Sequence, residues 1–452
     1  LAGDQFENAT LDDKVASGFN RNHGTTDEGG LIEEEYRVEY NVDRVKTTSN
    51  VWLGLTMECA QCHDHKYDPI SQKEYYQFFA FFNTIDEAGL YSYFTPSIPT
   101  PTLLMTDAAA KQKIADAEKQ AAAEAAELTK VSDTAGEAFE KWLAGRPAEA
   151  KLPGQVGHFP FDEYKDGKLP NFVAESKQAS SSQKNKIVPG KNGNALRLTG
   201  DDGVNLGIGN FKRTAPFSVA LWMNTPHHKE RTVVFSRSRA WTDAGSRGYQ
   251  MLLRDGHLSV SLIHFWPGNA ISVRTRVKLP KNEWHHVAIT YDGSTRAAGL
   301  KIFVDGKPAE IEIVKDHLYK NITGGGGDTI VIGQRFRDVG FAKGLVDDFR
   351  VFDRELTRGE VAQIHDGDTL ANLLARPADA LGQAERDTLR DYFSATASEP
   401  HAAQLAKLRA ARESVTKLLD GRGEIMVMEE LRLKPRSTFV LKRGVYSAPG
   451  ER

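Results

Sequence analysis

Apolar residues near the N-terminus recur at helical spacing. The pattern runs from Val38 to Val45, directly after three acidic residues that suit a helix N-terminus. Further along, Ser71 and Glu74 form a capping box before an aromatic run at 75–82, which we expect to face a core. The N-terminal region is therefore predicted to be mainly α-helical.

Two long helices are predicted on either side of the middle of the chain. The first runs from Leu103 to Leu143 and is rich in Ala, Glu and Lys, and the second carries an apolar seam from Leu405 to Leu419. Each has only a narrow apolar stripe. The stripes can cover one another if the helices pack as an antiparallel pair, which would bring the ends of the intervening region together. Packing of each helix against another domain is the alternative.

The region from about 155 to 367 changes to short alternating runs broken by Asp-Gly turns, which is typical of an all-β domain. From Phe217 to Met223 every second residue is apolar. The turn signals are Asp255-Gly256, Asp292-Gly293 and Asp305-Gly306. Glycine suits such turns because it accepts a positive φ.

Four motifs within this region carry a resemblance to a known fold. They are ALRL (195–198), FSVALW (217–222), WHHVAITYDG (284–293) and GLVDDFRVF (344–352). Their order resembles that of the LamG and concanavalin-like jelly rolls, so a two-sheet sandwich is implied. The resemblance implies a fold rather than a function, because this sandwich hosts lectins, hydrolases and adhesion modules. The E-x-D-x-x-E strand motif of the related laminarinases is absent, and we expect no glycosidase activity.

Composition narrows the range of partners. The 452 residues include 58 Lys and Arg against 61 Asp and Glu, without basic blocks, so nucleic acid and anionic membranes are not expected as partners. No stretch resembles a membrane span. The chain begins at Leu1 without a methionine or signal peptide, and we interpret it as a piece of a longer polypeptide, so the missing signal does not bear on the compartment.

Both cysteines of the chain lie in the segment Cys59-Ala60-Gln61-Cys62-His63. This is the spacing of covalent c-type haem attachment, in which two thiolates bond the haem and the adjacent imidazole of His63 becomes the proximal iron ligand. A local disulfide between Cys59 and Cys62 is one alternative. A structural zinc completed by His63 and His65 is another, although a single CxxC with crowded histidines departs from the usual two-knuckle layout.

The second axial position must be filled from the opposite haem face. The polar loop from Gly18 to Gly30 offers His23 as the best distal ligand, and an open site or a ligand from outside this chain is the alternative. Haem c is attached on the outer side of the cytoplasmic membrane. The motif therefore predicts a periplasmic, extracellular or cell-surface protein.

The β-region offers candidate sugar contacts, because aromatic faces stack on pyranose rings and neighbouring polar groups fix their orientation. The candidates are Trp241, Trp266, Arg239 and His264. The last two would add polar or charge-assisted bonds to an acidic sugar. Core packing is the alternative for the tryptophans. Asp347 and Asp348 are candidates for a structural calcium site, or else turn and surface residues.

Four further segments carry a resemblance to a family. They are GFNRNHGTTDEGG, EEEYRVEYNVDRVKTTSNVWLGLT, CAQCHDHKYDPISQKEYYQFFAFFNTIDE and TFVLKRGVYSAPGER. They resemble the multidomain cytochrome-type proteins of Planctomycetes, which combine a cytochrome c module, two domains of unknown function and often a LamG-like insert. The resemblance implies that residues 1–98 end the first unknown domain and that residues 432–452 begin the second. Residues 99–150 and 368–431 would be helical connectors around the sandwich.

Three functions are compatible with these observations. The leading expectation is an exported c-type haem protein that transfers electrons to a redox partner, or oxidises a substrate, while the sandwich holds a polysaccharide or other glycan. Whether it is an enzyme or a carrier stays open. The alternatives are a carbohydrate-binding or adhesion protein in which CxxCH is only a staple, and a hydrolase that uses His63-Asp64-His65 with a metal.

Overall fold

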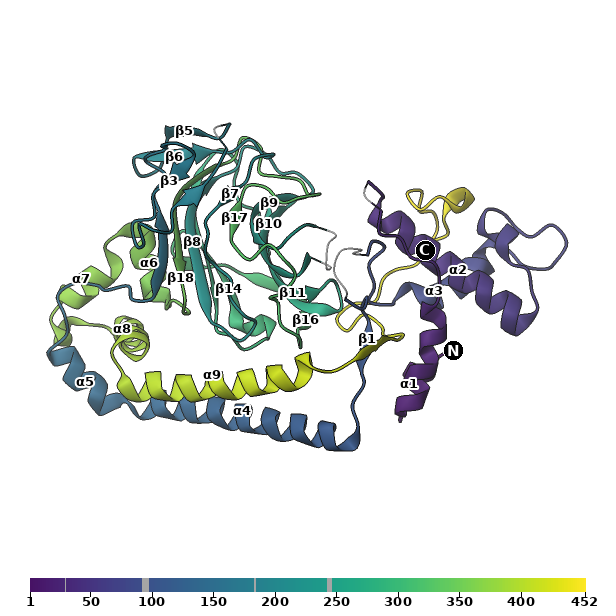
Figure 1. Cartoon of the computed structure of the whole chain (residues 1–452), viewed down its shortest axis with the longest axis horizontal. Helices are drawn as coiled ribbons and strands as arrows, with labels where there is room; N and C mark the ends of the chain where they lie inside the picture. The colour runs from purple at the N-terminus through teal and green to yellow at the C-terminus, as the bar shows by residue number, and fades with distance from the viewer. Residues whose placement is uncertain (29, 92–96, 183, 242–245) are drawn as a thin grey trace.

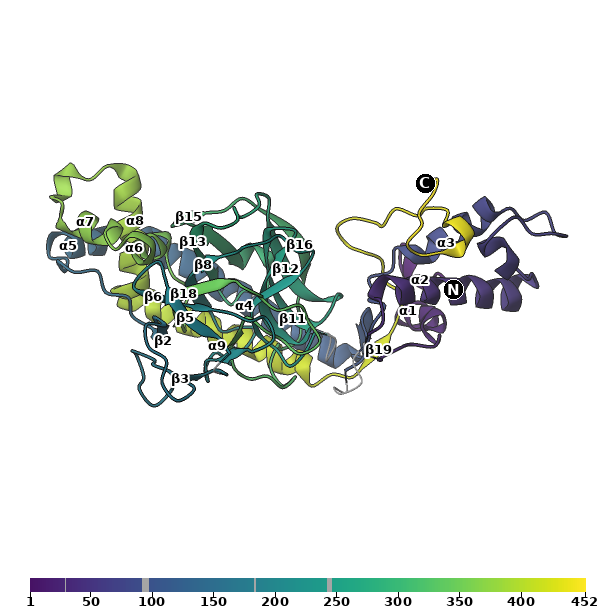
Figure 2. The ribbon, with the colours of Figure 1, turned by 90° about the horizontal axis from the view of Figure 1, so that it is seen from above.

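The computed structural model describes residues 1–28, 30–91, 97–182, 184–241 and 246–452. Figure 1 shows a helical module that contains both chain ends, a β-sandwich beside it, and a pair of long helices that runs beneath the sandwich. The view from above shows a cluster of short helices at the end of the sandwich away from the module (Figure 2). Among the described residues, no helix is long and apolar enough to cross a membrane.

In the part of the chain that the structure describes, the helical module contains three α-helices and several short turns. The helices are α1 (Leu11–Ser17), α2 (Glu33–Thr48) and α3 (Gln72–Asn83), and the turns are η1 (Gly3–Gln5), η2 (Gly18–Arg21), η3 (Ser49–Leu53) and η4 (Glu58–Gln61). The predicted capping box is confirmed, because Ser71 and Glu74 bond reciprocally at the start of α3. Tyr75, Phe79 and Phe82 form a core with α2, as the aromatic run predicted.

The C-terminal segment completes this module. Strand β19 (Glu424–Met426) pairs antiparallel with β1 (Thr102–Leu104). Beyond it, Leu441 joins the core of α2 and α3. The segment 438–441 is extended but forms no ladder, and this described stretch has only an isolated bridge from Leu441 to Pro449. Segments expected to belong to two different domains thus form one structural unit.

The predicted antiparallel pair of long helices is confirmed. Helix α4 (Ala108–Thr134) and helix α9 (Glu399–Asp420) lie side by side along the sandwich (Figure 1). Gln404 Nε2 on α9 donates to the Glu124 backbone carbonyl at 3.1 Å and to its carboxylate at 2.7 Å. The pair, together with the β1–β19 ladder at its end, joins the sandwich to the module at both ends of the insert.

The first long helix is shorter than predicted. It begins at Ala108, where the Asp107 side chain accepts the Ala110 N–H at 2.7 Å, and it ends at Thr134. After a break, α5 (Gly136–Ala144) turns Phe139 and Leu143 into a core with α7 (Thr369–Ala375) and α8 (Gln383–Thr396). Glycine is a poor helix former, so Gly136 favours a break at this point.

The middle region is a sandwich of two antiparallel sheets, as predicted. Within the described residues the first sheet has nine strands, in spatial order β16 (Ile311–His317), β12 (Asn269–Thr275), β11 (His257–Phe265), β10 (Gly248–Arg254), β9 (Thr232–Arg237), β17 (Val331–Ile332), β7 (Val204–Asn205), β4 (Ala179–Ser180) and β3 (Lys168–Leu169). The second sheet, again in the described part, contains β15 (Lys307–Pro308), β14 (Leu300–Val304), β13 (Trp284–Tyr291), β8 (Phe217–Asn224), β18 (Leu345–Phe352), β6 (Asn194–Arg197) and β5 (Lys186–Pro189), with β2 (Gln155–Phe159) also on β18.

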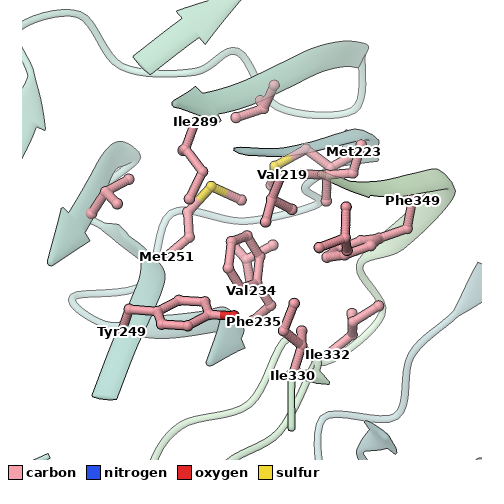
Figure 3. Close-up of a cluster of buried hydrophobic side chains, with 14 of the residues drawn as sticks. Val219, Met223, Val234, Phe235, Tyr249, Met251, Ile289, Ile330, Ile332 and Phe349 are labelled. Carbon is pink, nitrogen blue, oxygen red and sulfur yellow. The ribbon is translucent and has the colours of Figure 1, made fainter. Parts of the chain in front are cut away.

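The sandwich core lies between the inner faces of the two sheets (Figure 3). Val219 and Met223 of β8 meet Met251 of β10 there, so the predicted alternation from Phe217 is confirmed. The outer side of β8 is also covered, because Ala220 packs against helix α6 (Arg358–Asp366). The outer face of the nine-stranded sheet is turned toward the helical module instead, and polar residues line it.

Candidate functional site

The Cys59–His63 segment forms a short exposed turn on the helical module. Met57 and Ala60 are buried in the core of α2 and α3 and anchor the turn. A 3₁₀ helix has three residues per turn, so Cys59 and Cys62 project from the same side of η4. Both cysteines are free and exposed, and His63 is exposed beside them. The three residues that the sequence singled out are thus brought together on the surface.

One ring nitrogen of His63 is already engaged. Nδ1 lies 2.7 Å from the Asp64 backbone carbonyl, which requires the proton on Nδ1. In the neutral ring this leaves the Nε2 lone pair for a metal, and second-shell bonds of this kind orient ligating histidines. His65 lies in the next turn, where its Nδ1 accepts the Asp68 N–H at 2.9 Å.

Contacts from α3 and the C-terminal segment hold the turn in place. Gln72 Nε2 donates to the Gln61 carbonyl at 3.0 Å and to the Leu441 carbonyl at 3.1 Å, and the Tyr76 hydroxyl also donates to Gln61. Gly444 has φ +72°, and a Cβ there would lie 3.1 Å from Cys62 Sγ. The C-terminal segment therefore borders the Cys62 side of the turn.

The structure does not present His23 as an iron ligand. Its Nδ1 bonds the Gly24 carbonyl at 2.9 Å, its Nε2 accepts from Arg44 at 2.6 Å, and its ring lies 4.6 Å from that of Tyr40. Burial, with the Arg44 charge, lowers the pKa of His23. Arg44 in turn pairs with the buried Glu87 carboxylate at 2.7 Å. His23 belongs to a buried polar network, which argues against the predicted distal role.

The other predicted metal sites find little support. Among the residues described, no three of His, Cys, Asp or Glu converge as metal ligands, which bears on the zinc alternative at His65. Asp347 Oδ2 accepts the backbone N–H groups of Lys191 and Asn192 at 2.8 Å, and Asp348 pairs with His158 at 2.6 Å. Calcium takes six to eight oxygen ligands. Asp347 Oδ1 is buried without a partner, and the calcium site stays a prediction.

Trp241 lies at a pocket of about 520 Å³ on the sandwich. The Arg231 guanidinium stacks 3.6 Å from the ring centroid, and the Arg335 guanidinium lies at 5.7 Å. Asp338 holds both arginines, with Arg231 Nε at 2.6 Å and Arg335 Nη2 at 2.6 Å from its carboxylate. Because Arg231 covers one face of the ring, Trp241 offers at most one face to a sugar.

Trp266 lies at a different pocket, between the sandwich and the helical module. The half-buried ring lines a space of about 480 Å³ together with polar residues of β10, β11, β12 and β16 and with the segment 431–436. Lys315 Nζ is 6.0 Å from the ring centroid. The structure therefore separates the two tryptophans that we expected to act together.

The two predicted polar contacts do not join either tryptophan in these pockets. Arg239 is exposed and lies against Gly326. His264 Nδ1 donates to the Asn321 carbonyl at 2.6 Å and Nε2 accepts from Arg247 at 3.1 Å. Burial, reinforced by the Arg247 charge, lowers the pKa of His264 to about 3. Both ring nitrogens of His264 thus have protein partners, and its role as a sugar contact stays a prediction.

Sequence reasoning missed the residues that line the Trp266 pocket. Ser259 and Ser261 alternate with the apolar residues of β11, and Ser272 and Arg274 do the same on β12, so the period-two pattern held a signal for a polar outer face. Nothing in the sequence indicated that the segment 431–436 lines the pocket, because its position depends on contacts between residues far apart in the chain.

Family comparisons match two regions of the chain, the N-terminal helical region and the β-sandwich. Residues 1–87 match a family described as a protein of unknown function, DUF1549 (PSCyt2), and residues 198–362 match the concanavalin A-like lectin/glucanases superfamily. The chain thus combines a DUF1549 domain with a LamG/concanavalin-like sandwich, the combination that the sequence resemblance predicted. No curated protein matches the chain.

Solved structures that resemble the chain do so over about half its length. The binding domain of Paraclostridial Mosquitocidal Protein 1 is 14% identical with a TM-score of 0.38, covering 47% of this chain and 52% of that one. Domain 4 of AbnA, a GH43 extracellular arabinanase from Geobacillus stearothermophilus in complex with arabinotriose, is 19% identical with a TM-score of 0.34, covering 47% and 98%. The Botulinum Neurotoxin serotype G binding domain is 15% identical with a TM-score of 0.36, covering 47% and 50%. The chain spans about half of the first and third of these structures.

Proposed function

We propose that the chain is part of an exported c-type haem protein that carries a non-catalytic, glycan-binding sandwich. The observation that carries the haem half is the turn at Cys59–His63. It presents two free thiols on one side and an imidazole whose Nε2 has no hydrogen bond among the described residues. These are the groups that covalent haem attachment uses.

The surroundings of the turn fit a large apolar group. Four exposed apolar side chains stand on the turn that follows α2: Val51, Trp52, Leu53 and Leu55. An ion pair of 3.3 Å between Lys46 and Glu58 holds the end of α2 against η4, so this apolar surface adjoins the motif. An exposed apolar patch of this kind usually marks a binding surface. Cys59 and Cys62 would hold the haem and His63 would be the proximal ligand.

Bound there, haem supplies one-electron redox chemistry, for electron transfer to a partner protein or for oxidation of a substrate. With His23 in a buried network, the distal position is either open or filled from outside the described residues. An open position favours chemistry on a small ligand, and a filled one favours electron transfer. Attachment of haem c places the protein in the periplasm or at the cell surface.

The glycan-binding half rests on the concanavalin-like sandwich and on its two polar pockets, each lined by a tryptophan and arginines. Aromatic rings beside charged donors are typical of sugar sites. An adhesion protein whose CxxCH is a disulfide or metal staple remains the alternative.

The haem half is tested on the full chain, exported from a host with working haem c maturation. We expect a pyridine haemochrome spectrum of c-type haem that survives denaturation and acid-acetone extraction. His63→Ala should abolish proximal histidine ligation, whereas His65→Ala, a matched histidine two positions away, should leave it intact. A colourless protein whose mass is that of the disulfide form would establish the staple alternative.

A further inference from the structure

A pocket of about 480 Å³ lies between the nine-stranded sheet and the C-terminal segment. Its floor comes from β10, β11, β12 and β16, and its roof comes from Asp86 and residues 431–436. An ion pair of 2.5 Å between Lys315 on the floor and Asp86 on the roof bridges the two sides. The pocket therefore depends on both the sandwich and the helical module.

A row of polar side chains crosses the floor of this pocket. The strand registers place Gln250 opposite Ser261, Ser261 opposite Ser272, and Ser272 opposite Lys315. Gln250 is only 3% exposed and each serine only 1%. The two serine hydroxyls bond each other at 2.8 Å, but Gln250 Oε1 has no partner among the described residues. A buried polar group without a partner costs free energy, so this floor suits an occupant with hydroxyl groups.

The charge of the lining is positive. The cations are Arg254, Arg274, Lys315, Arg432, Lys434 and Arg436, and the acids are Asp86, Glu312 and Asp316. Two of the acids are paired with lining cations, Asp86 with Lys315 and Glu312 with Arg274. The excess of cations favours an anionic group in the pocket.

Arg254 is the cation best placed to hold that group. Within the described part of the chain its side chain makes no hydrogen bond or ion pair, and its Nε is buried without a partner, while the Glu33 carboxylate acts on it electrostatically from outside the pocket lining. Burial is the main effect that lowers the pKa of Arg254 to about 10, so the guanidinium stays charged at neutral pH. A planar guanidinium binds a carboxylate or a sulfate through two parallel N–H donors.

We infer that this pocket binds an acidic saccharide, a sugar that carries a carboxylate or a sulfate ester. Arg254 pairs with the acidic group, the Trp266 ring contacts a sugar face, and Gln250 bonds a hydroxyl. Lys434 closes the site from the roof, so the site is complete only in the full chain. The inference rests on the proposed glycan-binding function and names the ligand class and its place.

Calorimetric titration of the full chain tests this inference with three probes: a tetragalacturonate, a sulfated galactan oligosaccharide and a neutral β-glucan oligosaccharide. We expect binding of at least one acidic probe and little binding of the neutral one. Arg254→Met and Trp266→Ala should each weaken the affinity about tenfold, and Lys434→Ala about threefold. Arg276→Met, at an exposed arginine just beyond β12, is the matched control that should keep full affinity.

Each other outcome bears on a different claim. If Trp266→Ala and Lys434→Ala both bind the acidic probe with unchanged affinity, the probe binds elsewhere. That result overturns the assignment of the site to this pocket but keeps the glycan-binding function. Binding of the neutral probe alone also overturns the inference and keeps that function. No binding of any probe overturns both. Thermal unfolding shows whether each variant is folded. If Arg254→Met does not fold, the affinity of Lys434→Ala tests the pocket instead, because Lys434 is exposed and its replacement should not disturb folding.

Discussion

The Cys59–His63 turn and the Trp266 pocket differ in how the chain builds them. The turn gathers its reactive side chains within five consecutive residues, and they are exposed. The pocket gathers side chains from four strands and from a segment near the C-terminus, and its polar floor is buried. A site of the first kind is fixed by local geometry, whereas a site of the second kind exists only when the strand register and the module interface are both formed.

The largest effect should come from Cys59→Ala combined with Cys62→Ala. We expect complete loss of covalent haem, while the melting temperature should stay close to that of the haem-free parent protein, because both side chains are exposed and unpaired. Haemochrome spectra and thermal unfolding measure the two quantities. The affinity of the pocket for acidic sugar should stay the same in this variant, and a parallel loss would contradict the separation of the two sites.

A substitution that leaves a cavity in the sandwich core should affect the Trp266 pocket and not the Cys59–His63 turn. Leu221→Ala removes a fully buried side chain between the sheets and should cost about 2–5 kcal/mol of unfolding free energy. The pocket floor is the outer face of the nine-stranded sheet, whose inner face packs on this core, so the affinity for sugar should fall at the urea concentration where the sandwich unfolds, while haem attachment should persist. Urea unfolding with calorimetry provides the measurement. Equal loss of haem and of sugar binding would mean that the two regions unfold as one unit.

Gly444→Val tests the contact of the C-terminal segment with the turn. A β-branched side chain is strained at φ +72°, and its Cβ would press on Cys62 Sγ. We expect a loss of about 1–2 kcal/mol and slower haem attachment. Gly24→Val is a matched control because a Cβ at Gly24 meets no neighbouring atom. An unchanged stability and yield would show that the segment does not hold the turn.

A further effect concerns pH. The pKa of His264 is lowered to about 3 in the folded protein by burial, so the unfolded chain binds this proton first as pH falls below about 6.5. Stability from this residue is therefore present above pH 6.5 and is lost as pH falls toward 3, with a slope of at most about 1.4 kcal/mol per pH unit. His264→Asn should flatten the slope between pH 6.5 and 5 in urea titrations. If the unfolding free energy of His264→Asn falls with pH as steeply as that of the parent protein, His264 is not the source of the pH dependence.

Local signals in the sequence predicted local structure well. The capping box predicted at Ser71 was confirmed as a helix start, and the structure has another one at Thr357. The Asp-Gly turns at 255–256 and 305–306 adopt two positive φ values in a row, as hairpin turns of this kind do. In each case the residues that specify the structure are at most a few positions apart.

Features that depend on distant contacts were not predicted. The pairing of β1 with β19 joins residues more than 300 positions apart in the chain, and no propensity of either segment indicates it. The network of Arg44, Glu87 and His23 likewise combines a loop, a helix and a later turn. We predicted His23 as a ligand because it lies in a polar loop. In the folded protein its ring is half-buried and bonds to Arg44.

The measurement that tests the central claim most directly is the mass of the peptide that spans Cys59 to His63, isolated from the exported full chain under denaturing conditions. We predict that the peptide carries one haem through thioether bonds to both cysteines. A peptide recovered without haem from a host whose own c-type cytochromes are fully loaded would contradict the account.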